Sequence, residues 1–142
     1  MRAIIVLSAA IAAALAVSPS FAQEWLSVWR VVDPDDQHTY EVFIDESSIR
    51  AESTTRTATV KYLRTAPHSQ GKSGERVAYS ITSKSFQCDA RRIRLDTSEI
   101  HFPDGSLQYV DARGKAAWHA AHDPAAVKAL DIVCAAKNPK PG

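Results

Sequence analysis

The amino-acid sequence predicts an α+β domain, in which about six antiparallel strands form a sheet and one C-terminal helix is stapled to one face of it by a disulfide. Three observations support this prediction. Between residues 24 and 112, short runs of alternating apolar and polar residues are separated by turn-forming residues, which is typical of consecutive strands. After residue 122 the apolar spacing becomes three and four residues, as on one helix face. The only two cysteines, Cys88 and Cys134, lie one in each part.

The first half of the expected sheet contains three strands. They are residues 24–32, 39–45 and 55–65. Val42 and Ile44 fall on one face of the second strand, and Ala58 and Val60 fall on one face of the third, because side chains alternate along a strand. Segments rich in polar residues, Pro and Gly are expected to connect the strands. These connections are residues 33–38, 46–54 and 66–74.

The second half of the sheet is expected to be one long, bent hairpin followed by a short strand. The strands expected here are residues 75–88, 91–102 and 106–112. Each of the first two changes its alternation phase part-way along, for example between Ile81 and Phe86. Such a change indicates a bulge or a bend. The hairpin turn is expected near Asp89 and Ala90, and a Pro-Asp-Gly turn follows at residues 103–105.

Residues 122–137 are expected to form the helix. Asp123 is a suitable N-cap residue, and Pro124 suits the first helical position. The three-and-four spacing predicts one face that contains Val127, Leu130, Asp131 and Cys134. Lys137 is expected in the last turn, where the helix dipole favours a cation. Residues 138–142 are expected to fray.

A disulfide between the two cysteines is expected to hold this helix on the sheet. Cys88 ends the central strand, and Cys134 lies on the expected buried face of the helix. The bond would close a loop of 46 residues (134 − 88 = 46), for which the chain-entropy relation gives roughly 4 kcal/mol. A helix of about four turns is only marginally stable alone in water. We therefore expect the disulfide, together with burial of Val127 and Leu130, to keep it in place.

The first 22 residues have the pattern of a secretory signal peptide. Arg2 gives a positive start, and the 15 residues from 3 to 17 are apolar apart from Ser8. Small residues then surround an expected cleavage site between Ala22 and Gln23. The alternative is a membrane anchor, but the apolar run is shorter than the ~20 residues that span a bilayer. No cysteine follows the run, so we expect an exported protein, in the periplasm or secreted to the cell surface, without a lipid anchor.

The 120 residues that remain after cleavage (142 − 22 = 120) suit one domain with a single core. We assign residues 23–137 to this domain and residues 138–142 to a frayed tail. Without Arg2, 16 basic side chains (17 − 1 = 16) balance 16 acidic ones. A neutral total excludes the general electrostatic attraction to nucleic acid or to anionic lipid. The mature chain has no second apolar run long enough to span a membrane.

Several segments, taken in order, resemble one protein family. They are EWLSV, YEVFIDESSIR, VKYLRT, AYSITSKSFQCDARRIRL, FPDGSLQYV, an isolated Trp118 and a closing ALDIVC. This arrangement over residues 24–134 is similar to the surface-adhesin protein E family of Gram-negative bacteria. The resemblance implies an antiparallel sheet with a C-terminal helix held to one face by a disulfide. It also implies a non-enzymatic envelope protein that binds host extracellular-matrix or serum proteins.

Two other functions are weighed against this one. The first is a soluble periplasmic structural or inhibitory protein with no host ligand, and the second is a small enzyme of unrecognised type. No serine lies in a Gly-x-Ser-x-Gly elbow, and no nucleophile is paired with a base in a recognisable order. The Gly71-Lys72-Ser73 triplet lacks the earlier glycine of a phosphate-binding loop, since Ala66 occupies that position. We therefore expect no catalytic residues and no cofactor.

The densest cluster of like charge in the sequence consists of Lys84, Arg91, Arg92 and Arg94. These residues are the candidate partner-binding patch, which would suit an acidic or sulfated partner surface. The alternative is a solvated strand face whose charges discourage pairing with other edges.

Two histidines just before the helix are the candidates for a metal site. His119 and His122 lie three residues apart, but a metal site needs a third or fourth ligand. His101 and Asp123 are the available residues, and their spacing does not support ligation. We therefore expect surface histidines and no metal.

The first strand is apolar on both faces. Trp25 and Trp29 are expected on one side, and Leu26 and Val28 on the other. The helix can cover one face, while a second chain or a fold-back covers the other. A homodimer is therefore one hypothesis. We expect Trp118, like the other tryptophans, to lie in the core or against the helix.

Overall fold

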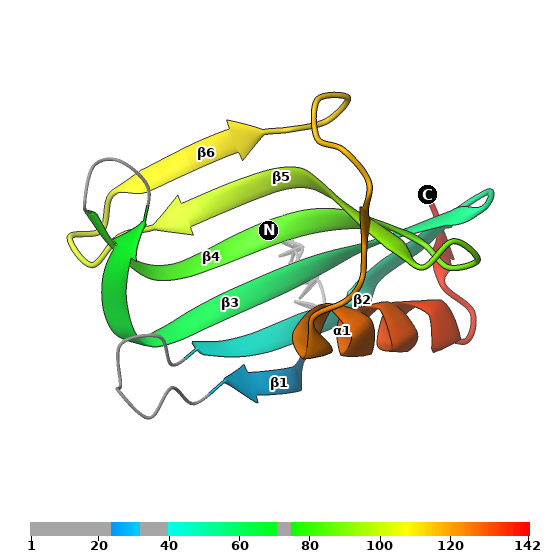
Figure 1. Ribbon diagram of the computed structural model, residues 1–142, viewed down its shortest axis with the longest axis horizontal. Helices are drawn as coiled ribbons and strands as arrows, with labels where there is room; N and C mark the ends of the chain where they lie inside the picture. The colour runs from blue at the N-terminus through cyan, green and yellow to red at the C-terminus, as the bar shows by residue number, and fades with distance from the viewer. Residues whose placement is uncertain (1–23, 32–39, 71–74) are drawn as a thin grey trace, which may run out of the picture.

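The computed structural model of the chain describes residues 24–31, 40–70 and 75–142 (Figure 1). The expected signal peptide, its cleavage site and the expected turn at residues 33–38 lie outside the described residues. Within the described ranges the chain forms one mainly antiparallel sheet, and one helix lies across a face of it.

Six strands cross the sheet in the order of the chain, each antiparallel to the next. They are β1 (Trp25–Val31), β2 (Tyr40–Glu52), β3 (Thr55–Gln70), β4 (Glu75–Gln87), β5 (Arg92–His101) and β6 (Leu107–Asp111). Two strands of two residues each enlarge the sheet beyond the six that we expected. β7 (His119–Ala120) pairs with β5, and β8 (Lys140–Pro141) pairs with β2. Two residues are too few to show an alternating pattern, so the sequence did not reveal these strands.

β2 continues through the segment that we expected to be a connection, residues 46–54. A bulge interrupts its pairing with β3 between Asp45 and Arg50, and the pairing then resumes as far as Glu52. The buried carboxylate of Asp45 accepts hydrogen bonds from the amide (3.0 Å) and the hydroxyl (2.6 Å) of Ser47. These local bonds replace ladder bonds that a bulge removes. The polar residues that suggested a loop therefore stabilise an irregular strand.

β3 also extends further than expected, into the segment 66–74 that we expected to be a polar loop. Its pairing with β4 becomes irregular between Leu63 and His68, and then continues to Gln70. Backbone pairing requires no apolar side chains, so the polar composition of this segment concealed the strand.

The bent hairpin of β4 and β5 is confirmed. The register of the two strands shifts between Ser83 and Lys84, where the sequence phase predicts a bulge. The turn spans Cys88 to Arg91, and Arg91 has a φ of 51°. The Pro-Asp-Gly turn is also present, and Gly105 there has a φ of 86°, a value that glycine adopts without strain.

The helix α1 (Pro124–Ala135) begins where the sequence predicts, but its buried face is different. The carboxylate of Asp123 caps it by accepting a hydrogen bond from the amide of Ala126 at 2.9 Å. The buried residues are Ala125, Ala129, Leu130 and Val133. Val127 is only half-buried, and the exposed Asp131 instead pairs with Arg91 at 2.9 Å. Ala125 and Ala129 on the inner face allow the helix to lie close to the sheet. The predicted face was based on the larger apolar residues and did not include these alanines.

An arginine from the sheet binds the C-terminal end of the helix. Because the helix ends at Ala135, Lys137 lies beyond its last turn, which contains no basic residue. Nη1 of Arg56, on β3, donates hydrogen bonds to the carbonyls of Val133 (2.7 Å) and Ala136 (2.9 Å). Arg56 thus supplies a charged donor to two carbonyls at the helix end, of which only that of Val133 also accepts a backbone bond, from the amide of Ala136 at 3.4 Å.

The tail that we expected to fray, residues 138–142, is paired instead. β8 lies parallel to β2, and the amide of Gly142 donates to the carbonyl of Ala51 at 3.1 Å. Asn138 has a φ of 56°, which turns the chain after the helix and back to the sheet.

The first strand contains a bulge that corrects our assignment of its faces. Its pairing with β2 shifts just before Trp29, so Val28 is the extra residue and is buried. Trp25 and Trp29 therefore lie on opposite faces. Lys61 of β3 lies over the ring of Trp25 at 5.5 Å, while Lys128 of the helix lies over Trp29 at 5.8 Å.

The hydrophobic core lies between α1 and the face of the sheet that the helix covers. Its largest fully buried members are Val42, Ile44, Val60, Phe86, Leu130 and Val133. Figure 1 shows the helix at the β1–β2 side of this face. The β5–β6 side of the same face therefore lies beyond the helix, and the chain between β6 and α1 crosses it.

Candidate functional site

The predicted disulfide is present. It joins Cys88, which follows β4, to Cys134 of α1, with an S–S distance of 2.09 Å and a Cα–Cα distance of 5.6 Å. The Cα separation is within the usual range for disulfides. The ion pair between Arg91 and Asp131 lies at the same end of the β4–β5 hairpin. The hairpin turn and the helix are therefore connected by a covalent bond and by an exposed ion pair.

The structure does not bring the four basic residues of the predicted patch together. Lys84 pairs with Leu95 in the ladder, and Arg94 is the next residue on that strand, so Lys84 and Arg94 point to opposite faces. Arg94 binds Asp96 at 3.1 Å, and its guanidinium carbon lies 4.7 Å from the ring centroid of Trp118. Trp118 is thus half-buried against an arginine rather than in the core.

The other two members of the patch lie at the tip of the hairpin. Arg91 is about half exposed and is paired with Asp131. Arg92 is exposed, and among the described residues its side chain has no hydrogen-bond or ion-pair partner. The four basic residues therefore lie in three places. Arg91 and Arg92 are exposed at the hairpin tip, Arg94 is ion-paired beside Trp118, and Lys84 lies on the helix-covered face.

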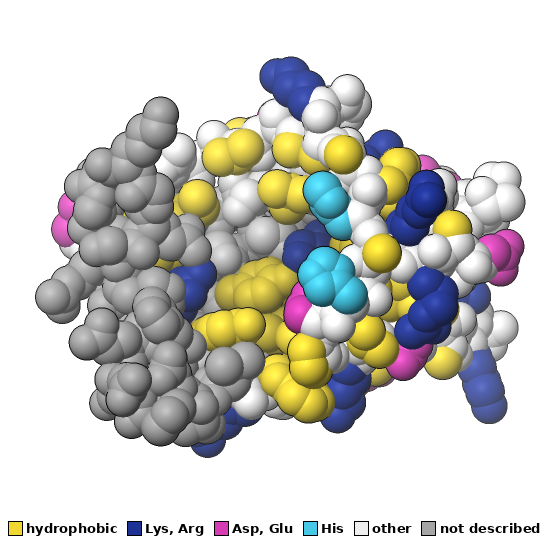
Figure 2. Space-filling view, viewed as in Figure 1, with side chains coloured by type: hydrophobic (Ala, Val, Ile, Leu, Met, Phe, Trp, Pro, Cys, Tyr) yellow, Lys and Arg dark blue, Asp and Glu magenta, His cyan; other side chains and the backbone are white. Residues whose placement is uncertain are grey.

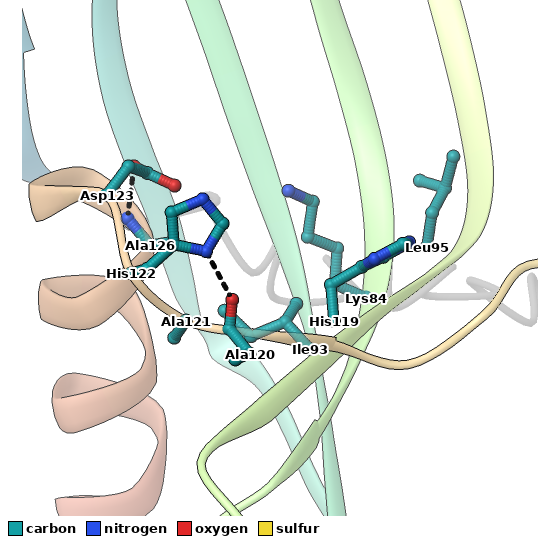
Figure 3. A pocket seen from close by; sticks show the side chains of 9 residues that line it. All are labelled: Lys84, Ile93, Leu95, His119, Ala120, Ala121, His122, Asp123 and Ala126. Atoms are coloured by element: carbon teal, nitrogen blue, oxygen red, sulfur yellow. Dashed lines mark hydrogen bonds between the residues drawn. The ribbon is translucent and has the colours of Figure 1, made fainter.

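An open cleft of about 210 Å³ lies on that face, beside the N-terminal end of α1. Lys84 of β4 and the apolar Ile93 and Leu95 of β5 form its floor. Residues 119–123 and Ala126 of the helix form its wall. Figure 2 shows this hollow, with hydrophobic and basic side chains inside and histidines at its rim, and Figure 3 shows the lining residues.

The wall belongs to the connecting segment, residues 112–123, which runs from β6 to α1 (Figure 1). Two backbone hydrogen bonds hold it to the β4–β5 hairpin: the amide of Ala112 donates to the carbonyl of Asp96 in β5 (2.8 Å), and the amide of Ala121 donates to the carbonyl of Arg91 in the turn (3.0 Å). Pairing of β7 with β5 lies between them. Sequence reasoning missed this role because the segment has no apolar periodicity; its isolated tryptophan and two histidines were the only signals.

Lys84 supplies the positive charge of the cleft. Its Nζ donates a hydrogen bond to the hydroxyl of Tyr62 at 2.5 Å and lies 4.9 Å from the centroid of the same ring. In the described part of the chain, no carboxylate lies within ion-pair distance of Lys84. By contrast, Arg91, Arg94 and Arg113 each have an aspartate within 3.1 Å. The cleft therefore contains an ammonium group without a protein counterion among the described residues.

The histidines that we expected at the surface lie on the rim of the cleft and are exposed. Nδ1 of His122 lies 2.9 Å from the carbonyl oxygen of Ala120, so the ring donates a proton through this nitrogen. His101 lies elsewhere, with its ring stacked on Tyr79 at 4.2 Å. In the ranges that the structure describes, no three His, Cys, Asp or Glu side chains gather as metal ligands would.

Two tyrosines on the helix-covered face lie close to the cleft. The ring centroids of Tyr40 and Tyr62 are 6.4 Å apart. Burial raises the pKa of Tyr40 above its ordinary value, and the nearby negative charge of Asp123 raises it further. Tyr40 is therefore a neutral phenol at physiological pH, and it places aromatic surface close to the carboxylate on the rim.

The family model of surface-adhesin protein E matches residues 29–135. The chain belongs to the surface-adhesin protein E family. Among solved structures, crystal form II of Haemophilus influenzae protein E is similar, with a TM-score of 0.45 and 16% sequence identity. The match covers 66% of this chain and 80% of that chain. No curated protein matches the chain.

The resemblance to the surface-adhesin protein E family that we inferred from the sequence is thus confirmed. Membership of this family indicates an adhesin-like, non-enzymatic protein. In the described ranges, α1 has too few residues to span a bilayer, and no other helix there is a candidate.

Proposed function

We propose that this protein is an exported, non-enzymatic binding module of the cell envelope whose partners are host extracellular-matrix or serum proteins. The family match over residues 29–135 is the observation that carries this proposal. The signal-peptide pattern supports export, and the Cys88–Cys134 disulfide fits an oxidising compartment. On this proposal the mature chain begins at Gln23, and residues 23–137 form the binding domain.

We place the protein contact at the basic residues of the β4–β5 hairpin. Arg91 and Arg92 contribute most, because they are exposed at the tip. The ion pair of Arg91 is exposed on both sides, and such pairs contribute only about 0–1 kcal/mol, so a partner carboxylate or sulfate can replace Asp131. Arg94 and Lys84 contribute less, since each already has a partner in the fold.

The test is binding of the purified mature protein to immobilised matrix proteins, serum proteins and heparin at two salt concentrations. Binding should weaken as salt rises, because exposed charges are screened over about 8 Å at physiological ionic strength. Changing Arg91, Arg92 and Arg94 together to Ser should weaken it further. A control variant removes the same charge from exposed positions elsewhere: Arg30, Arg113 and Lys115.

The outcomes distinguish a wrong contact surface from a wrong function. If the wild type binds and both triple variants bind equally well, the hairpin is not the contact surface. If the wild type binds none of these partners, host-protein binding itself is wrong. Circular dichroism of each variant must match the wild type for the comparison to hold.

The alternative is a soluble periplasmic structural or inhibitory protein with no host ligand. The expected cleavage before Gln23 favours it, because a lipid-anchored envelope protein carries a cysteine at that position. Adding protease to intact cells decides between the two: a chain on the outer surface is degraded, whereas a periplasmic chain is protected until the outer membrane is opened.

We also propose a homodimer through β1 as a hypothesis for assembly. Leu26 and Trp29 on this edge strand are 37% and 36% exposed, and an edge strand with exposed apolar side chains can pair with another chain. Sedimentation analysis of the mature protein tests it, and a concentration-independent monomer would exclude the dimer.

A further inference from the structure

The cleft beside α1 is separate from the hairpin tip and has the features of a ligand site. Its floor is apolar at Ile93 and Leu95, and its volume is about 210 Å³. Specific pockets combine apolar walls with a few polar groups that fix orientation, and those for drug-sized ligands start at about 300 Å³. This cleft therefore suits one side chain with a small polar group. A folded partner domain is too large to enter it.

The charge inside the cleft favours an anionic group. The ammonium of Lys84 has three donors, of which the Tyr62 hydroxyl occupies one. Both groups are partly buried, and no described carboxylate neutralises the ammonium. Figure 3 shows the Lys84 side chain rising from β4 into the cleft. A ligand anion would complete the coordination that the described fold leaves open.

The rim limits the anion to a single charge. The carboxylate of Asp123 also lines the cleft, where it caps the helix through the amide of Ala126. A phosphate monoester carries about −1.5 to −2 charges at neutral pH, so it would meet one cation and one fixed carboxylate. A carboxylate carries one charge, which Lys84 alone can balance.

We propose that this cleft binds a monocarboxylate that carries one aromatic or branched apolar group. The carboxylate accepts hydrogen bonds from Nζ of Lys84, and the apolar group packs on Ile93 and Leu95. Two sources supply this chemistry: a free aromatic or branched carboxylic acid, and the C-terminal residue of a polypeptide. The inference goes beyond host-protein binding at the hairpin, and either can fail without the other.

The experiment titrates the isotopically labelled mature protein with four probes, followed by amide chemical shifts in NMR. The probes are 3-phenylpropionate, N-acetyl-phenylalanine, the uncharged amide of N-acetyl-phenylalanine, and inorganic phosphate. Both acids should shift the amides of residues 93–95 and 119–123, and the uncharged amide should bind at least tenfold more weakly. Tighter binding of N-acetyl-phenylalanine than of 3-phenylpropionate identifies a polypeptide C-terminus as the source, and the reverse order identifies a free acid.

Variants locate the two halves of the site. Lys84→Met keeps the length of the side chain and removes its charge, and it should weaken the acids at least tenfold. Ala126→Phe keeps Lys84 and fills the cleft, and it should also abolish their shifts. Lys115→Met removes one exposed charge outside the cleft and should leave the affinities unchanged.

Several results would overturn the proposal. These are equal binding of the acid and its amide, stronger binding of phosphate than of either acid, or no shifts with any probe. Unchanged acid binding by Ala126→Phe would overturn it as well. If Lys84→Met does not fold, Ala126→Phe and the amide probe decide the question in its place.

Discussion

Replacing Arg56 by glutamine should loosen the C-terminal end of α1 and leave the sheet intact. Nη1 of Arg56 donates hydrogen bonds to the carbonyls of Val133 (2.7 Å) and Ala136 (2.9 Å). The helix has no basic residue of its own in the last turn, so this guanidinium is the cation that the helix dipole favours there. Its removal leaves the carbonyl of Ala136 to water and the carbonyl of Val133 with only the long bond from the amide of Ala136, at 3.4 Å.

The expected magnitude follows from the number and the environment of these bonds. A hydrogen bond to a charged group contributes about 1.5–3 kcal/mol. Both bonds are only partly buried, and one nitrogen makes them both, so water recovers part of the loss. We expect the free energy of unfolding to fall by roughly 2 kcal/mol. For a domain of about 120 residues, this corresponds to a decrease of about 8 °C in melting temperature.

The assay is thermal and urea unfolding followed by circular dichroism for Arg56→Gln, Arg56→Lys and Arg92→Gln. Arg92→Gln is the matched control, because it removes the same charge from an exposed side chain with no partner among the described residues. Its effect should stay within about 0.5 kcal/mol. Arg56→Lys should recover part of the stability, since an ammonium can still bond to one carbonyl. Equal stability of Arg56→Gln and Arg92→Gln would refute the proposed role of Arg56.

Other perturbations test the remaining parts of the fold. Replacing both cysteines by serine should lower the free energy of unfolding by about 2–4 kcal/mol, measured by urea unfolding; an unchanged midpoint would contradict this. Asp123→Ala should cost about 1 kcal/mol through the lost N-cap, and Asp123→Asn, which can still cap, is its control. Phe86→Ala should cost about 3–5 kcal/mol, because its side chain is fully buried, and a loss below 1 kcal/mol would contradict that burial. Hydrogen bonds from Arg113 lower the pKa of Asp111 from 3.8 to about 2. This pair therefore stabilises the fold above pH 3.8 and loses its effect as the pH falls through 2. Arg113→Ala should return the pKa towards 3.8, as NMR titration of the carboxyl would show; a value still near 2 would contradict this.

The parts of the fold predicted from sequence are those that local patterns encode directly. The change of phase between Ile81 and Phe86 predicted the bulge of the β4–β5 hairpin, because alternation reports which face a side chain occupies. Asp123 and Pro124 likewise marked the start of the helix. β2 was cut short for the opposite reason. The hydrogen bonds between Asp45 and Ser47 stabilise a bulge within the strand. The polar residues of this bulge are the same types that occur in loops, so the sequence indicated a loop.

The candidate cleft could not be predicted, because its parts come together only through the tertiary fold. Lys84 and Leu95 share the β4–β5 hairpin, but His122 follows 27 residues later (122 − 95 = 27), and the connecting segment has no pattern that indicates its path over the sheet. Closeness in sequence was also misleading for the basic patch. Arg94 lies within β5, on the face opposite Lys84, so four neighbouring charges do not make one surface.

The order of strands in the sheet has a consequence for how the molecule is assembled. Each of the six main strands pairs with the next along the chain, so these contacts can form progressively as the chain emerges from its N-terminal end. Docking of the helix is different, because Leu130 joins the same core cluster as Val28 near the other end of the described chain. We therefore expect helix docking to be a late step, limited by closure of a long loop. Cys88 emerges 46 residues before Cys134 and has no intramolecular partner during that interval. Mixed disulfides at Cys88 are the misfolded species that we expect when synthesis is slow or when oxidation precedes completion of the helix.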